Sequence, residues 1–166
     1  MRSLTRWAAA LTALVLSLTT LTPAPASASV RLQLTLELLV VDDQNESGND
    51  EIGIFFIAPV APGKKYLMWP DDRDRMNVNA GDCWYINLVR GCPNGYTNKS
   101  VGEQGPLPMY FTTGETWTFE IWEDDVTSSD DLILRESFTV GEEPYQELVF
   151  RGTRSGADYT LYARLS

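Results

Sequence analysis

Apolar and polar residues alternate along much of the chain after residue 29. The run from Val30 to Val40 carries leucine or valine at every second position, with polar residues at most positions between them. A period of two is typical of a β-strand that buries one face. We therefore expect one core-facing set in this strand: Leu32, Leu34, Leu36, Leu38 and Val40.

The same alternation recurs at residues 117–121 and 159–165, and a short continuous apolar run at 52–57 fits a strand inside a sheet. Weaker strand candidates cover 65–69, 84–89, 109–112, 132–140 and 147–151, with glycine or proline turns between most of them. No window of ten or more residues keeps a helical period. The pattern predicts an all-β fold, an antiparallel eight- or nine-stranded β-sandwich.

The first 28 residues have a different composition. Arg2 and Arg6 precede an apolar stretch at 7–21, and Ala26-Ser27-Ala28 forms a small-residue cleavage pattern. This order is typical of a secretory signal peptide, and the apolar stretch is short for a membrane span. We therefore expect a signal peptide at 1–28, a single domain at 29–166 and a secreted, extracellular product.

Charge and composition exclude several classes of function. The chain has 13 basic and 23 acidic residues, a net charge of −10, and contains no histidine. A surplus of acid opposes binding to the nucleic-acid backbone, so no nucleic-acid partner is expected. The lack of histidine excludes a Ser-His-Asp triad and imidazole-ligated zinc.

Cys83 and Cys92 are the only cysteines in the chain. Exported proteins fold under oxidising conditions, and eight intervening residues do not form a C-x-x-C redox motif. The sequence therefore predicts a structural disulfide between Cys83 and Cys92.

The acidic residues concentrate in two segments. Residues 42–51 contain five acids in ten positions, and residues 123–131 contain five in nine. Like charges crowded together oppose compaction, and a divalent cation relieves this repulsion. Ca²⁺ takes six to eight oxygen ligands from flexible loops, so the two segments are candidate calcium loops. The alternative is that they are solvated loops with no ligand.

The second acidic segment resembles the third calcium loop of C2 domains. That loop follows a hydrophobic strand ending in an acid-x-acid step, with another Asp six residues on and an apolar pair after it. The stretch from Ile121 to Ile133 is similar to this pattern without a gap, although Glu123 stands where Asp is usual. The closing strand of the family resembles residues 158–165.

The resemblance implies a C2-like sandwich that binds Ca²⁺ through both acidic segments. It implies metal ligands at Glu123, Asp125 and Asp131, with Ser128 as a further oxygen. In the first segment the resemblance implies two further metal ligands, Asp50 and Asp43. Asp43 would have to serve because Gln44 stands at the place where the family has an acid. The basic cluster that binds inositol lipids is absent, and Val126-Thr127 would be a poor membrane wedge, so we expect no membrane docking.

Other functions compete with this interpretation. Glu120 and Glu123 could suggest a glycosidase pair, but their spacing fits a loop better than a cleft. Several aromatic residues could stack on sugars: Trp69, Trp84, Tyr85, Tyr96, Tyr110 and Trp122. We expect a secreted, non-enzymatic calcium-binding module for an unidentified extracellular ligand. The alternative is a calcium-independent extracellular carbohydrate- or protein-binding module.

Overall fold

The computed structural model describes residues 29–44, 48–59, 64–70, 76–87, 89–101, 106, 108–124 and 130–166. The N-terminal segment 1–28, expected to be a signal peptide, lies outside the described residues, as do Asp125 and Ser128. The described residues form these strands: β1 (Arg31–Asp43), β2 (Asp50–Ile57), β3 (Lys65–Trp69), β4 (Met76–Val78), β5 (Asp82–Tyr85), β6 (Thr97–Ser100), β7 (Met109–Thr112), β8 (Thr116–Glu123), β9 (Asp131–Thr139), β10 (Gln146–Gly152) and β11 (Asp158–Leu165).

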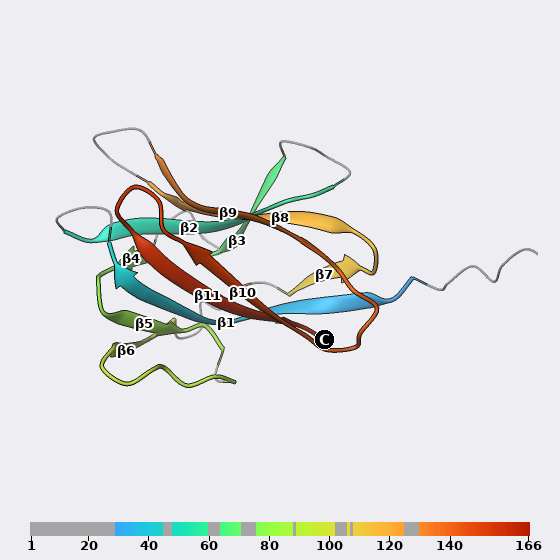
Figure 1. The fold of residues 1–166 in the computed structure, drawn as a ribbon, viewed down its shortest axis with the longest axis horizontal. Helices are drawn as coiled ribbons and strands as arrows, with labels where there is room; N and C mark the ends of the chain where they lie inside the picture. Colours follow the sequence, from blue (N-terminus) through green and yellow to red (C-terminus); the bar gives the residue numbers. More distant parts are fainter. Residues whose placement is uncertain are drawn as a thin grey trace, which may run out of the picture.

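The strands build two sheets that pack face to face (Figure 1). Sheet A has the order β10-β11-β1-β5-β6, with β7 also paired to β1. Sheet B has the order β3-β2-β8-β9, with β4 also paired to β2. The predicted all-β sandwich is confirmed, and the apolar run 52–57 lies inside sheet B as expected.

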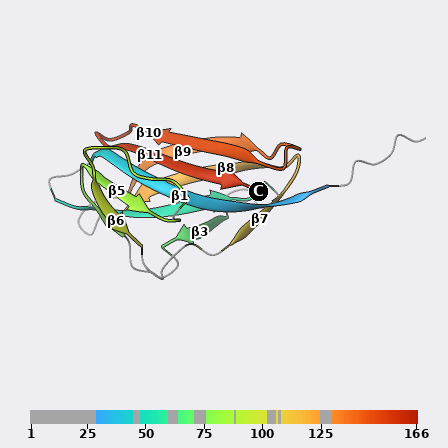
Figure 2. The ribbon, with the colours of Figure 1, turned by 90° about the horizontal axis from the view of Figure 1, so that it is seen from below.

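The strand count exceeds the predicted eight or nine, because eleven strands form in the described residues. The two additional strands are β4, with only three residues, and β6, whose sequence Thr-Asn-Lys-Ser contains no apolar side chain. Neither can show a hydrophobic period. Strand β6 also pairs parallel to β5 at the edge of sheet A, whereas the other strand pairs of the described residues are antiparallel (Figure 2).

The prediction that Leu32, Leu34, Leu36, Leu38 and Val40 of β1 all face one core is wrong. The register between β1 and β11 shifts between Leu36 and Leu38, which marks a β-bulge or a similar irregularity. An extra residue in one strand reverses the alternation that follows it. Beyond this point Leu39 and Val41 face the main core, while Leu38 and Val40 belong to a separate cluster.

This separate cluster holds the segment that carries the disulfide. Leu38, Val40 and Cys83 are buried there, and Tyr85, Cys92, Tyr96 and Tyr162 pack against them. The predicted bridge is present, with an S–S distance of 2.09 Å between Cys83 and Cys92. The backbone N–H of Cys92 also donates to the Tyr85 hydroxyl at 3.2 Å.

The main core fills the space between the two sheets. Phe119 of β8 stacks on Phe150 of β10, with ring centroids 4.6 Å apart. Phe56 of β2 contacts Phe111 of β7 at 5.4 Å. These contacts cross from one sheet to the other, so burial of aromatic and aliphatic surface joins the layers.

Candidate functional site

The strand ends bring both acidic segments to one end of the sandwich. Strand β1 ends at Asp43 and β2 begins at Asp50, while β8 ends at Glu123 and β9 begins at Asp131. Glu123 lies opposite Asp131 in one strand pair and opposite Ile52 of β2 in the other. We call the group Asp43, Asp50, Glu123 and Asp131 the acidic end.

A backbone hydrogen bond joins the two segments directly. The N–H of Asp124 donates to the carbonyl oxygen of Glu51 at 2.7 Å. The two acidic segments, which are far apart in the chain, are therefore neighbours in the fold.

Two of these carboxylates are buried. Asp50 is 0% and Glu123 is 1% exposed, while Asp43 is exposed and Asp131 is half-buried. The buried pair continues the inward alternation of the strands, since Asp50 precedes Ile52 by two residues and Glu123 follows Ile121 by two. Their carboxylates therefore lie where the hydrophobic core ends.

Tyr159 completes this layer and was not expected as a site residue. It is 0% exposed, and its hydroxyl donates to a carboxylate oxygen of Asp50. Burial, the hydrogen bond to Asp50 and the negative charges of Asp50, Glu123 and Asp43 all raise the pKa of Tyr159, so its hydroxyl stays protonated. The sequence signal was its place as the first inward residue of the alternating strand 159–165.

More polar contacts surround the acidic end. Tyr96 donates its hydroxyl to Asp42, and this bond raises the pKa of Tyr96. Arg151 donates to both carboxylate oxygens of Asp158, at 3.1 and 2.8 Å, and Asp158 lies opposite Asp43. The first contact joins the stretch before β6 to the end of β1, and the second joins β10 to the start of β11.

Gln44 has a structural part in the first acidic segment. Its side-chain N–H donates to the carbonyl oxygen of Gly48, and its side-chain oxygen accepts from the N–H of Ala80 at 2.7 Å. The amide thus fastens the segment after β1 to the turn before β5. This contact accounts for Gln44 at a position where the C2 pattern has an acid.

The acidic end offers carboxylate oxygens, the ligands that Ca²⁺ prefers. Among the described residues, however, no three Asp, Glu, Cys or His side chains stand close enough together to hold a metal ion. The expected ligands Asp43, Asp50, Glu123 and Asp131 are gathered at one end, and Asp125 lies outside the described residues. The donor chemistry fits calcium, and the described carboxylates alone do not complete a ligand set.

Glu120 and Glu123, the residues that could suggest a glycosidase pair, lie at different places on the sandwich. Glu120 points away from the core, since its neighbours Phe119 and Ile121 are both 0% exposed and face inward. Its carboxylate contacts Lys65 at 2.9 Å and Arg135 at 3.2 Å. Glu123 lies at the acidic end, so the two carboxylates do not face each other across a cleft.

Some aromatic candidates for sugar stacking are covered by the chain itself. Trp69 is 2% exposed, and the Lys65 ammonium lies 3.6 Å from the ring centroid of Trp122. Tyr110 is 50% exposed, with the Arg31 guanidinium 5.3 Å from its ring centroid. Trp84, Tyr85 and Tyr96 are half-buried.

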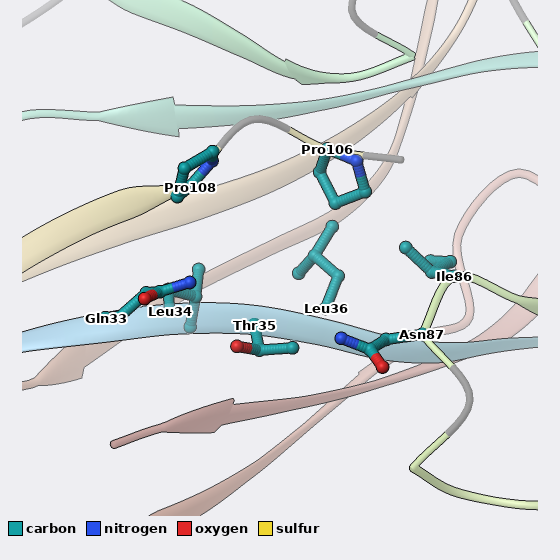
Figure 3. A pocket seen from close by; sticks show the side chains of 8 residues that line it. All are labelled: Gln33, Leu34, Thr35, Leu36, Ile86, Asn87, Pro106 and Pro108. Carbon is teal, nitrogen blue, oxygen red and sulfur yellow. The ribbon is translucent and has the colours of Figure 1, made fainter. Parts of the chain in front are cut away.

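A hollow of about 230 Å³ lies beside β1, between the stretches that pair with β5 and with β7 (Figure 3). Thr35, Leu36, Asn87 and Pro106 are among the residues that line it, and the lining residues within the described part of the chain carry no charge.

Comparisons with known proteins concern the fold. No family model matches the chain, and no curated protein matches it in sequence. A solved C2 domain is similar, with 10% identity and a TM-score of 0.47, over 82% of this chain and 97% of that one. A structure of the tandem C2 domains of Extended-Synaptotagmin 2 gives 11% identity and a TM-score of 0.45, over 97% of this chain and 48% of that one.

Human GIVD cytosolic phospholipase A2 is also similar, with 10% identity and a TM-score of 0.46, over 81% of this chain and 17% of the enzyme. The described residues form two packed β-sheets, the kind of fold that the resemblance in the sequence implied. Within the described residues, no helix is long and apolar enough to cross a membrane.

Proposed function

We propose that this chain is a secreted, non-enzymatic calcium-binding β-sandwich module. The observation that carries the proposal is the acidic end, where Asp43, Asp50, Glu123 and Asp131 come together from four strands. The Asp124–Glu51 hydrogen bond ties the two acidic segments to each other there.

Electrostatics favour a cation at this end. Carboxylates that share one end of a domain repel one another, and burial of Asp50 and Glu123 makes their charge more costly. A divalent ion would lower this free energy, and Ca²⁺ tolerates the irregular oxygen geometry that loops provide. Mg²⁺ demands a stricter octahedron and loses its waters reluctantly, so calcium is the better fit.

The proposed ligands are Asp43, Asp50, Glu123, Asp125 and Asp131. Tyr159 is a positioning residue, because its hydroxyl donates to one oxygen of Asp50. The described carboxylates do not form a ligand group of three by themselves. The proposal therefore makes Asp125 indispensable, and Asp125→Asn should remove calcium binding.

Secretion is proposed from the sequence pattern of residues 1–28, and the Cys83–Cys92 disulfide is compatible with an oxidising compartment. The non-enzymatic part rests on the lack of histidine and on Glu120, whose carboxylate is bound by Lys65, Arg135 and Trp122. A carboxylate held in this way is a structural group.

Calorimetric titration of residues 29–166 with CaCl₂, after removal of metal by chelator, tests the proposal. Saturable binding is expected in the parent protein, with a large loss in Asp50→Asn and Asp125→Asn. Glu142→Gln is the matched control, because Glu142 is exposed in the turn between β9 and β10, at the opposite end of the sandwich. A parent protein with no calcium heat would favour the calcium-independent binding module.

A further inference from the structure

The hollow beside β1 has an apolar side. Leu34, Leu36 and Ile86 line it and belong to the main core, where all three are buried. Leu36 points toward the rings of Pro106 and Pro108, which lie across from β1 (Figure 3). This side therefore offers a ligand an aliphatic surface.

Two carboxamides and one hydroxyl form the polar side of the hollow. Gln33 and Thr35 are two residues apart on β1, so their side chains leave the same face of the strand. Asn87 lies beside them, because its backbone N–H donates to the carbonyl oxygen of Glu37 at 3.0 Å. Within the described part of the chain, no hydrogen bond engages the side chains of Gln33, Thr35 and Asn87. Their donors and acceptors are therefore available to a ligand.

Backbone contacts limit the length of the hollow. Leu34 pairs with Met109 of β7 at one end, and the N–H groups of Ile86 and Asn87 both donate to the carbonyl oxygen of Glu37 at the other. Three residue steps of β1 separate these contacts, roughly 10 Å of strand. An extended peptide of four or more residues is too long for this space. A compact group fits it, since the volume is about 230 Å³.

The lining also restricts the charge of a ligand. Its residues in the described part of the chain are uncharged. An ion placed here would lose hydration without gaining an ion pair from them, which is unfavourable. The matching ligand is therefore uncharged, with hydrogen-bonding groups on one side and C–H groups on the other.

We propose that this hollow binds one uncharged sugar residue. Each hydroxyl of a sugar both donates and accepts hydrogen bonds, as do the side chains of Gln33, Thr35 and Asn87. The C–H groups of the sugar ring would pack against Leu36 and Pro106, which removes apolar surface from water. The hollow contains none of the aromatic residues that the sequence suggested for sugar stacking, so it is a different site.

The proposal does not depend on calcium. The hollow lies beside residues 33–36 of β1, and the proposed calcium ligand Asp43 lies at the end of that strand. Titrations in chelator therefore test the hollow alone, and failure of one proposal leaves the other standing.

Residues 29–166 are titrated in chelator with the methyl glycosides of glucose, galactose, mannose and N-acetylglucosamine, and amide shifts are followed by NMR. At least one sugar should give saturable shifts at Thr35, Leu36 and Asn87. Thr35→Val keeps the shape of the side chain but removes its hydroxyl, and it should weaken binding about fivefold, the effect of one neutral hydrogen bond. Asn87→Ala should weaken binding by a similar factor.

Asn77→Ala is the matched control, because Asn77 is exposed on β4 of the other sheet. It should leave the affinity unchanged. Equal weakening by Asn87→Ala and Asn77→Ala, or no saturable shift with any of the four sugars, would overturn the proposal. Tighter binding of N-acetylalanine amide, an uncharged peptide unit, than of any sugar would also overturn it.

A trisaccharide of the sugar that binds best separates two sources of the residue. Tighter binding of the trisaccharide would assign the hollow to a residue within a sugar chain, and equal affinity would assign it to a single sugar.

Discussion

Glu120 and Glu123 lie three residues apart on β8 and are each 1% exposed, but they lie at different places in the fold. The Glu120 carboxylate contacts Lys65 at 2.9 Å and Arg135 at 3.2 Å, and accepts from the indole N–H of Trp122 at 2.6 Å. Glu123 lies at the acidic end with Asp50. Burial alone does not mark a functional carboxylate, because the sign of the neighbouring charges decides what the group can do.

Glu37 supports this distinction. It is 3% exposed, and Arg90 and Arg164 each approach its carboxylate to 3.5 Å. Glu37 and Glu120 both sit within a strand and are both compensated by two cations from the chain. The carboxylates of the acidic end lie where strands end and the core meets solvent, and this placement is compatible with the proposed calcium ion.

The largest effect is expected from Glu120→Gln. Breaking a buried ion pair costs about 3–5 kcal/mol, but the Lys65 and Arg135 side chains are 39% and 55% exposed and can turn to water. We expect a loss of about 2–3 kcal/mol in the free energy of unfolding, the same in calcium and in chelator. Urea denaturation measures it, with Glu136→Gln, an exposed position on β9, as the control.

Tyr159→Phe should have the next largest effect. It removes the hydroxyl that donates to Asp50, and a buried hydrogen bond to a charged group contributes about 1.5–3 kcal/mol. We expect a loss of about 2 kcal/mol in chelator and weaker calcium binding. An unchanged calcium affinity would show that the hydroxyl does not position Asp50.

The raised pKa of Tyr159 adds a pH dependence to the same variant. Because the folded state holds the proton more tightly, the contribution of this group is complete below about pH 10, the ordinary tyrosine pKa, and is lost as pH rises above it. The parent protein should therefore lose stability more steeply between about pH 9.5 and 11 than Tyr159→Phe, by at most about 1.4 kcal/mol per pH unit. Parallel slopes in urea denaturation would contradict this account.

The smallest change in stability is expected from Glu123→Gln in chelator. The substitution removes the repulsion between this carboxylate and those of Asp50 and Asp43. This gain offsets part of the free energy of unfolding that is lost with the carboxylate. We expect a change below about 1 kcal/mol, smaller than that of Glu120→Gln. A loss as large as that of Glu120→Gln would make both glutamates structural and remove the contrast between them.

Much of the fold was predictable because its strands are amphipathic. The alternation at 159–165 and the apolar run 52–57 each identified a strand directly. The register shift between Leu36 and Leu38 could not be read in this way, since every residue from Leu38 to Val41 is apolar and fits either face. Strand β6 has no apolar residue and forms only because β5 is beside it.

The acidic end was predictable in part. The density of acidic residues in the sequence identified both segments. Their proximity in the fold depends on the pairing of β2 with β8, which are distant in the chain. Tyr159 carried a readable signal in its inward position, although its hydrogen bond to Asp50 required the packing of sheet A on sheet B.

Calcium-dependent thermal unfolding of residues 29–166 tests the central claim most directly, with the parent, Glu120→Gln and Glu123→Gln measured in millimolar CaCl₂ and in chelator. At about 100 times Kd, calcium should add roughly 2.7 kcal/mol, a rise of several degrees in Tm. Glu120→Gln should keep this rise from a lower starting Tm, and Glu123→Gln should lose most of it. Superimposable curves for the parent with and without calcium would contradict the account.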